Sequence, residues 1–450
     1  MFKIKIDKKI LAAVICAAVL PFAVTGCTKK PGGEDGGLEK EIDWDSTPEI
    51  SIKGEKIVVL GYSDADVDST AFQLFEAQGA KVEHYKVEAV VLADQLHHMQ
   101  LMGEQVDLVQ FKPDLFPAEY IADSFVSVDG EGLLDFSDDL WKGNAADLAA
   151  DLEFRGTRYI APLRITFPAY LQYSRALFKE EGLDDPYELY EKGKWTWERF
   201  IEMSVEFIEN STGGKRYGVT GWFAEPAFYS AGVPLVKEED NLFKSNNGGG
   251  DVEKILDILE EIQEKNLYYS DRLWRGEYPE SDQFLFYSMG DWTLQRSNED
   301  NAEAQVYAVP FPKLDAGGEH YSIADFDAYL MVKGSEKQYA AARYIECERT
   351  VEVDPEFAKP AQDFAVKKLK LMNPAQYKAR EKFLAEVKPV YDYGFGVKGL
   401  YRSGSSSDER GAYNNVYDTL MENGKRIAPG DISEAIDEQL RIYYSTVNTH

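Results

Sequence analysis

The sequence predicts an α/β fold in two domains, with mainly parallel sheets flanked by helices. Strand-like apolar runs at 56–62, 80–87 and 106–109 are separated by segments with helical periodicity. Strands that alternate with helices at this spacing form parallel sheets with helices on both faces. About 400 residues follow an apolar N-terminal leader, and this length usually corresponds to two domains.

Residues 1–26 predict an export signal rather than part of the fold. An apolar core over 10–24 follows a basic start formed by Lys3, Lys5, Lys8 and Lys9. The apolar run is short for a membrane-spanning helix, which needs roughly 20 residues. Cys27 comes directly after Gly26, and this arrangement resembles a bacterial lipobox. We therefore expect cleavage before Cys27 and acylation of its thiol, for instance with palmitate; an ordinary signal peptide is the alternative.

Residues 27–50 predict a flexible tether, because they are rich in glycine and charge and have little to bury. After loss of the leader and acylation of Cys27, Cys347 is the last of the three cysteines. One cysteine cannot form an intramolecular disulfide, so the hydrophobic core must hold the fold together.

The composition is strongly acidic. The chain has 49 Lys and Arg against 79 Asp and Glu, a net charge of −30, and loss of four lysines and one aspartate with the leader gives about −33. This charge disfavours nucleic acid and anionic membrane surfaces as ligands. Aromatic residues make up 13% of the chain, and this mixture suits ligands that combine apolar faces with hydroxyl groups, such as sugars.

The loop after the first strand is a candidate for ligand contact. Ser63 and Asp64 follow that strand and precede a predicted helix, which is a ligand-facing position in α/β folds. The Asp-x-Asp-x-Asp sequence at 64–68 also resembles the start of a calcium loop, but Ser69 and Phe75 occupy the positions of the required Gly and Glu. Helix capping is the favoured use, and we expect no metal and no cofactor.

The next elements continue the α/β pattern. The predicted helix at 92–102 has an apolar face formed by Leu92, Leu96, Met99 and Met102. His97 and His98 are adjacent, so they face different directions and are expected at the surface. The predicted strand at 106–109 is followed by Asp114, a further polar candidate beyond the carboxyl end of a strand.

Two proline-containing segments, 158–171 and 306–312, are predicted to contain strands that lead into crossing segments. Between them, one helix is predicted to stop at Gly182 and another to begin with Thr196 as its N-cap. Trp195 and Trp197 flank this cap, and we expect them to be packing anchors rather than ligand contacts.

The stretch 284–313 is the strongest site candidate. Aromatic residues precede Met289, and Gly290, Asp291 and Trp292 then begin a short polar helix. A tryptophan at a helix start can present its ring to a cleft while neighbouring N–H groups bind polar atoms. Packing of Trp292 against its own domain is the alternative.

The order of these features resembles a known family. After the lipobox come KVE, DLV, YIAPLR, LFKEEGLDDP, KWTWERF, RYGVTGW, MGDW, YAVPFPK and YLMVKGSEKQYAAARYIE. In this order they resemble the family 1 extracellular solute-binding proteins of ABC importers, which include maltodextrin-binding proteins. The resemblance extends from about residue 55 to 350 and rests on order and spacing rather than on any one motif.

The resemblance implies a two-lobed, type II periplasmic-binding-protein fold, in which each lobe is a mainly parallel sheet flanked by helices. The lobes would comprise residues 51–162 plus 308–348 and residues 163–307 plus 349–450. The implied crossing segments are 159–166, 306–311 and 345–350. Such lobes close on their ligand, which stabilises the closed state.

Sugar sites combine aromatic faces with a few polar groups. The stacking candidates are Trp292 and Trp222, with Phe223, Tyr229 and Tyr401 behind them. The polar candidates are Ser63, Asp64, Asp114, Arg164, Thr166, Asp325, Asp327 and Arg402.

The positions of these residues differ in what they imply. Arg164 and Thr166 follow the first crossing, where the resemblance implies a ligand contact. Asp325 and Asp327 precede a strand that returns to the first lobe. Tyr401 and Arg402 belong to a Gly-rich segment at 393–404, which is either a ligand-facing loop or an ordinary surface loop.

We expect a monomeric, lipid-anchored receptor on the outer face of the membrane of a single-membrane bacterium. It would capture a carbohydrate, an oligosaccharide in particular, and deliver it to the permease subunits of an ABC transporter. A polyamine or amino-acid derivative is the alternative cargo. A surface signalling protein that acts as the partner of a sensor kinase is a further alternative function. Catalysis, for instance by a glycoside hydrolase, is disfavoured because the chain has only five histidines and lacks the G-x-S-x-G and H-E-x-x-H motifs.

Overall fold

The structure is a computed structural model, and it divides the chain into two compact units. It describes residues 51–62, 70–116, 124–166, 169–240, 242–246, 249–269, 278, 283–290, 293–294, 296–297, 305–357, 366, 373–397, 399–400 and 411–447. The first unit consists of Met1–Gln110, Ser124–Trp141 and Ala328–Leu369. The second consists of Phe111–Asp123, Lys142–Asp327 and Lys370–His450. The lobe boundaries given above rest on the resemblance and stay a prediction.

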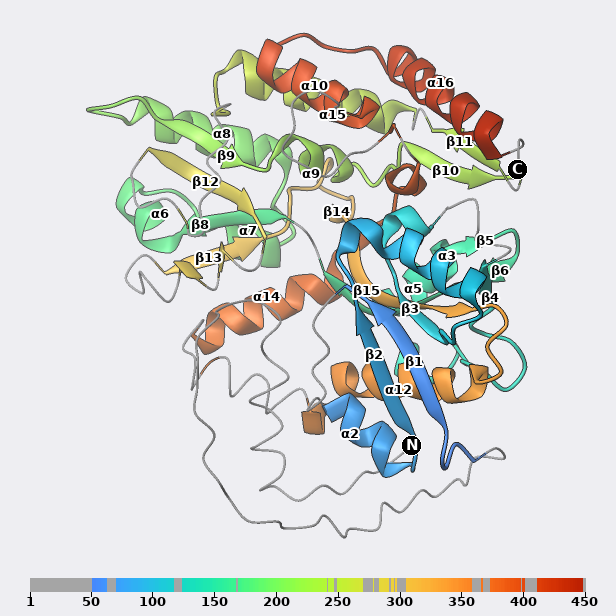
Figure 1. The fold of residues 1–450 in the computed structure, drawn as a ribbon. Helices are drawn as coiled ribbons and strands as arrows, with labels where there is room; N and C mark the ends of the chain where they lie inside the picture. Colours follow the sequence, from blue (N-terminus) through green and yellow to red (C-terminus); the bar gives the residue numbers. More distant parts are fainter. Residues whose placement is uncertain are drawn as a thin grey trace. The chain divides into compact units, whose positions relative to one another are not determined.

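The first unit is built on a sheet with the strand order β2-β1-β3-β15-β4. β1 (Lys56–Gly61) pairs in parallel with β2 (Lys81–Lys86), and Figure 1 shows the two strands side by side. β1 also pairs in parallel with β3 (Leu108–Gln110). β15 (Asp325–Val332) runs antiparallel to β3 and to β4 (Phe125–Val126). The burial of every residue of β1 after Lys56 matches a central strand that is covered on both faces.

Helices α2 (Thr70–Ala77) and α12 (Gln338–Val353) pack against each other in this unit. The rings of Phe72 and Phe75 lie edge-on to Tyr344, with centroid distances of 5.7 and 5.4 Å. Residues 345–350, where a third crossing was implied, lie within the continuous helix α12. The unit also contains the 3₁₀ turns η1 (Ala89–Val91) and η3 (Asp139–Trp141).

Helix α3 (Leu92–Met102) confirms most of its predicted apolar face. Leu92, Leu96 and Met99 are buried, but Met102 is 64% exposed. Met102 lies in the last turn, directly before Gly103, which ends the helix in the left-handed conformation (φ 68°). The predicted apolar face of this helix therefore includes one residue, Met102, that the fold leaves exposed. His97 and His98 are exposed, as predicted.

The second unit is built on a sheet with the order β13-β8-β12-β9. Its strands are β8 (Tyr170–Ser174), β9 (Tyr217–Gly221), β12 (Phe284–Met289) and β13 (Val306–Val309). β12 is parallel to β9, whereas β8 is antiparallel to both β12 and β13. The sheet is thus less parallel than expected for each lobe. The spacing of strands and helices did not reveal this, because the direction of β8 depends on where the chain enters the sheet.

Around this sheet lie helices whose predicted caps are confirmed. Thr196 accepts a hydrogen bond from the backbone N–H of Arg199 at 3.3 Å, and Gly182 ends α6 in the left-handed conformation. The helices of this unit include α5 (Asn144–Asp151), α6 (Arg175–Glu181), α7 (Pro186–Glu191), α8 (Trp197–Glu209), α9 (Ala224–Tyr229), α10 (Gly250–Glu264), α14 (Pro374–Glu386), α15 (Ala412–Asn423) and α16 (Pro429–Val447).

Short strands and turns complete the second unit. β10 (Val236–Glu239) and β11 (Leu242–Ser245) form an antiparallel pair, as do β5 (Glu153–Phe154) and β6 (Thr157–Arg158). β14 (Tyr321–Ile323) and β16 (Lys388–Val390) form a parallel pair. The remaining elements are β7 (Ile160–Thr166) and the 3₁₀ turns η2 (Pro113–Leu115) and η5 (Tyr393–Gly396).

Trp195 and Trp197 are packing anchors, as predicted. Both rings are buried, and each indole N–H has an internal acceptor. Trp195 donates to the carbonyl of Pro310 at 2.8 Å, and Trp197 donates to Oγ of Ser230 at 2.9 Å. These bonds satisfy the indole N–H groups inside the core.

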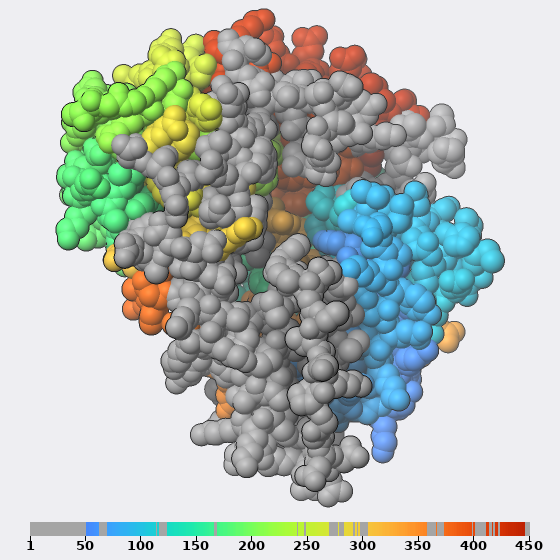
Figure 2. Space-filling model, turned by 60° about the vertical axis from the view of Figure 1, so that its left-hand side comes forward, coloured from blue at the N-terminus to red at the C-terminus, as the bar shows by residue number. Residues whose placement is uncertain are grey.

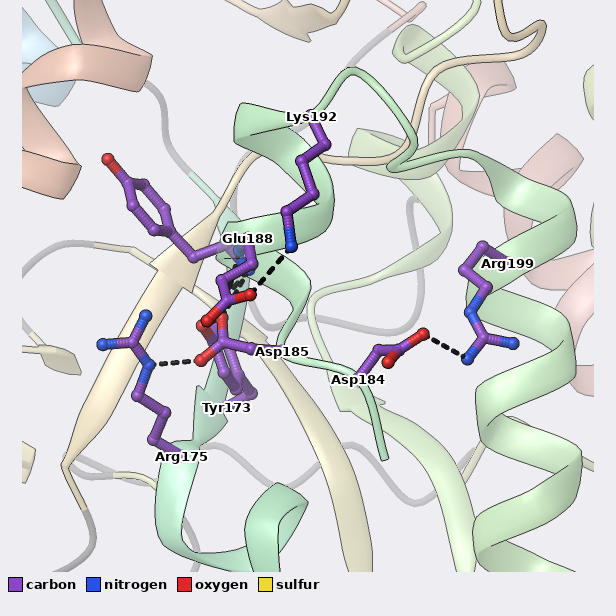
Figure 3. A network of polar contacts seen from close by, with 8 residues as sticks. Tyr173, Arg175, Asp184, Asp185, Glu188, Lys192 and Arg199 are labelled. Carbon is purple, nitrogen blue, oxygen red and sulfur yellow. Dashed lines mark hydrogen bonds and ion pairs between the residues drawn. The ribbon is translucent and has the colours of Figure 1, made fainter. Parts of the chain in front are cut away.

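A polar network joins β8, α6 and α7 in the second unit (Figure 3). Asp185 caps α7 by accepting from the backbone N–H groups of Tyr187 and Glu188, and it also forms an ion pair with Arg175. The Tyr173 hydroxyl donates to Asp185 at 2.7 Å, and burial raises the pKa of Tyr173 so that it stays a donor. The network therefore fixes the start of α7 against the central sheet.

Helix α15 packs against α10, and α16 packs against α15 and β11. Figure 1 shows α15 beside α10, and in Figure 2 the red C-terminal part of the chain meets the yellow-green part at the top of the view. Arg426, between α15 and α16, pairs with Glu260 of α10 at 3.1 Å. In the described part of the chain, no helix is long and apolar enough to cross a bilayer. Nor do the described His, Cys, Asp and Glu residues form a group of three or more that could hold a metal ion.

Candidate functional site

The candidate site is built where β9 and β12 end. These strands are parallel, with Gly221 opposite Ser288, so their carboxyl ends lie at the same edge of the sheet. Trp222 follows β9 directly, and Gly290 follows β12. The carboxyl edge of parallel strands is where α/β folds bind ligands.

The backbone of Trp222 is fixed from both sides. Its N–H donates to the carbonyl of Ser288 at 2.9 Å, and its own carbonyl accepts from the hydroxyl of Ser288. Gly221 precedes it with φ +96°, and a Cβ atom on Gly221 would lie 2.3 Å from the Ser288 carbonyl oxygen. Only glycine fits this close approach, so the loop leaves the strand in one defined direction.

The indole of Trp222 is also fixed. The ring is half-buried, and its Nε1 donates to Oε2 of Glu225 at 3.0 Å. Glu225 lies in the first turn of α9 and is 5% exposed. The sequence analysis missed Glu225, although its spacing of three residues from Trp222 at a helix start is a signal for such a contact.

The corner after β12 is anchored from the neighbouring strand. Gln172 of β8 is fully buried, and its Nε2 lies 3.0 Å from the carbonyl of Gly290 and 2.6 Å from Oγ1 of Thr293. Thr293 in turn donates its backbone N–H to Gly290 at 3.2 Å. The chain is therefore held on both sides of positions 291 and 292, where the sequence placed its strongest candidate.

Phe223, predicted to lie behind the stacking candidates, lies in the core of the second unit. It is 1% exposed and stacks on Phe200 at a centroid distance of 6.0 Å, with the rings of Trp197 and Phe311 also close. Trp222 directly follows β9, whereas Phe223 is already the N-cap residue of α9, and Phe223 enters the core while Trp222 stays only partly buried. Tyr229, placed behind the stacking candidates, is likewise fully buried in the core.

Arg164 and Asp327 come together as an ion pair. Arg164 lies in β7 and Asp327 near the start of β15, both within the second unit, and the two side chains are 46% and 43% exposed. The strand β15 begins at Asp325, so both aspartates lie within the strand rather than before it. Asp325 is exposed, yet desolvation by its surroundings raises its pKa, and the charge of Asp327 raises it further.

The other candidates fall outside what the structure describes. These residues are Cys27, Ser63, Asp64, Trp292, Tyr401 and Arg402, together with the side chains of Asp114 and Thr166. The predicted leader, the tether and the calcium-like sequence at 64–68 also lie outside the described residues. Their roles stay predictions.

Comparison with solved structures shows which fold this is. The sugar-binding protein MalE from Xanthomonas citri matches with a TM-score of 0.64 at 16% identity, over 88% of this chain and 100% of that one. The cyclic α-maltosyl-1,6-maltose binding protein from Arthrobacter globiformis matches with a TM-score of 0.60 at 13% identity, over 88% and 99% of the two chains.

A third match has the same extent. The galacto-N-biose-/lacto-N-biose I-binding protein from Bifidobacterium longum has a TM-score of 0.59 at 13% identity, over 86% of this chain and 97% of that one. At these identities the matches show the fold, which is the two-lobed α/β fold expected from the sequence.

The family is shown by the sequence itself. No curated protein sequence is significantly similar to the chain. Residues 70–378, however, match the family model of bacterial extracellular solute-binding proteins. The matched residues make up more than half of the chain and include β9, β12 and Trp222. The proteins that this family model describes are binding proteins rather than enzymes. The chain belongs to the bacterial extracellular solute-binding protein family.

Proposed function

We propose that this protein is a receptor that captures an extracellular carbohydrate, in particular an oligosaccharide, for an ABC transporter. The observation that carries the sugar assignment is the partly buried Trp222, which is fixed at the carboxyl edge of β9 and β12. An indole face can stack on the C–H surface of a sugar ring. Ligand sites in general combine such apolar faces with a few polar groups that fix the orientation of the ligand. The fold shared with proteins that are named as sugar-binding supports the same assignment.

Capture would occur by closure of two lobes, comprising 51–162 plus 308–348 and 163–307 plus 349–450. Trp292, Ser63, Asp64, Asp114, Arg164, Thr166, Asp325 and Asp327 are the further proposed ligand contacts, with Tyr401 and Arg402 in the Gly-rich segment. A ligand that contacts both lobes favours the closed state by its higher affinity for it. The permease subunits of the transporter are the partner that would receive the solute.

The location follows from the N-terminal sequence. The basic start, apolar core and Gly26-Cys27 sequence support export, cleavage before Cys27 and a lipid anchor on its thiol. A monomer tethered by residues 27–50 to the outer face of the cell membrane would reach solutes outside the cell. Mass spectrometry of the N-terminal peptide checks the anchor, because an acylated Cys27 adds the mass of its acyl groups.

A thermal-shift screen tests the proposed cargo. A ligand that binds only the folded state raises the melting temperature as the ligand concentration increases. At 100 times its dissociation constant, the ligand adds about 2.7 kcal/mol to the free energy of unfolding. We expect oligosaccharides to give this rise, and monosaccharides, polyamines and amino acids to give a smaller rise or none. Stabilisation by polyamines or amino acids alone contradicts the sugar assignment, and turnover of a glycoside contradicts the receptor assignment.

A further inference from the structure

The hydrogen bond between Trp222 and Glu225 points to a preformed platform for one saccharide ring. We infer that Glu225 is a positioning residue, which holds the indole of Trp222 in the orientation that stacks on the C–H face of the sugar. The inference rests on the proposed function for the nature of the ligand. The orientation of the Trp222 ring in the ligand-free protein does not depend on the proposed function.

The backbone of Trp222 is fixed before any ligand binds. Two hydrogen bonds with Ser288 hold the Trp222 peptide groups, and Gly221 allows the approach that these bonds require. The remaining freedom of Trp222 lies in its side-chain torsions. The bond from Nε1 to Oε2 of Glu225 restricts those torsions.

The two partners of this hydrogen bond differ in how deeply they are buried. Glu225 is 5% exposed, whereas Trp222 is half-buried. Removing a carboxylate from water costs free energy unless its oxygens accept hydrogen bonds, and the indole N–H provides one. A tryptophan that only covered the surface would not need a buried acceptor, because its N–H could bond to water.

Comparison with Trp195 and Trp197, two described tryptophans of the same unit, supports a special role for the pair. The fully buried Trp195 and Trp197 donate to a backbone carbonyl and to a serine hydroxyl, and both rings lie entirely in the core. Trp222 also donates its indole N–H to an internal acceptor, but the residue is only partly buried. A ring that is fixed yet accessible binds without the entropy loss of ordering a free side chain.

The pair is tested by NMR of the indole N–H groups in the purified protein. The resonance of Trp222 is assigned by its absence in Trp222→Phe. We expect Glu225→Ala to shift and broaden this resonance in the ligand-free protein, because the acceptor is lost, and Glu225→Gln to keep it sharp, because the amide oxygen still accepts.

Binding is measured on the same proteins with maltotriose, raffinose and lacto-N-biose, each tested separately. We expect Glu225→Ala and Trp222→Phe to weaken binding of the recognised saccharide by about 10-fold, and Glu225→Gln by less than about 3-fold. Trp222→Phe leaves Glu225 in place, so it tests the platform even if Glu225→Ala does not fold.

The outcomes separate the two proposals. An unchanged Trp222 resonance in Glu225→Ala overturns the positioning role, whatever the protein binds. Equal loss of affinity in Glu225→Gln and Glu225→Ala, with a sharp Trp222 resonance in the former, also overturns it, because the carboxylate would then contact the sugar itself. If none of the three saccharides binds to the wild-type protein, the sugar assignment fails while the NMR comparison still decides whether Glu225 holds the ring.

Discussion

The hydroxyl of Tyr229 donates a hydrogen bond of 2.9 Å to Oδ2 of Asp392, which lies 163 residues further along the chain. The Asp392 carboxylate is fully buried and accepts four more hydrogen bonds. Their donors are the backbone N–H groups of Leu235, Val236 and Gly394 and the hydroxyl of Tyr413. One side chain thus joins α9, β10, η5 and α15 immediately before the Gly-rich segment.

Replacement of Asp392 by asparagine is expected to destabilise the second unit by about 3 kcal/mol, because an amide group would face donors that now meet a carboxylate oxygen. Urea unfolding monitored by circular dichroism measures the change. The matched control is Asp437→Asn on α16, where the side chain is exposed and the change should stay within about 0.5 kcal/mol. Equal stability of the two variants contradicts the role of Asp392.

Gly221→Ala is expected to be costly for two reasons, a positive φ and a Cβ atom placed 2.3 Å from the Ser288 carbonyl. Together they should lower the free energy of unfolding by about 3 kcal/mol. Gly249→Ala separates the two effects, because Gly249 also has a positive φ (57°) but nothing within 4 Å of the added atom. Its cost should be about 1 kcal/mol, and equal costs would show that the Ser288 contact is unimportant.

The structure accounts for which of these features the sequence could predict. The strand at 306–309, the Thr196 cap and the Gly182 stop were found because each depends on neighbours within a few residues. Trp195 and Trp197 were also correctly predicted as packing anchors, because they flank a helix cap that is visible in the local sequence.

The features that the sequence did not predict depend on distant contacts. Asp392 looked like one of 79 acidic residues until its partners from three other segments were brought around it. Phe223 and Trp222 are adjacent aromatic residues, and only the direction of the chain after β9 decides which enters the core. The direction of β8 likewise follows from the arrangement of the whole sheet.

The ion pair of Arg164 and Asp327 should matter more for binding than for stability. Both side chains are nearly half-exposed, so Arg164→Gln should change the free energy of unfolding by less than about 1 kcal/mol. If Arg164 contacts the solute, as proposed, affinity should fall by about 10-fold or more, because a charged hydrogen bond is lost.

A suitable control for Arg164 is Arg199→Gln, which breaks surface pairs with Asp184 and Glu202 outside the candidate site. Calorimetric titration compares the two variants. Unchanged affinity in Arg164→Gln removes this residue from the proposed set of ligand contacts.

His320 predicts a specific pH dependence of stability. Its Nδ1 lies 3.0 Å from the carbonyl oxygen of Phe311, its ring lies edge-on to Tyr190, and burial lowers its pKa. Because the unfolded chain binds this proton more readily, stability should fall as the pH drops below the ordinary histidine pKa of about 6.5. The fall should level off below the folded-state pKa.

Thermal unfolding between pH 8 and 5 tests this, with His320→Gln as the comparison, since a neutral side chain has no such proton to bind. The variant should lose less stability than the wild type over this range. Parallel pH profiles for the two proteins would mean that His320 is protonated equally in the folded and unfolded chains.

We propose that this solute-binding protein binds a carbohydrate on a platform that includes Trp222. The most direct measurement is calorimetric titration of the purified protein with maltotriose, raffinose and lacto-N-biose, beside putrescine and glutamine, repeated on Trp222→Ala. We expect one-to-one binding of a saccharide, and we expect Trp222→Ala to weaken it at least about 10-fold without changing the fold. Binding of putrescine or glutamine with no saccharide bound, or saccharide binding that Trp222→Ala leaves intact, would contradict this proposal.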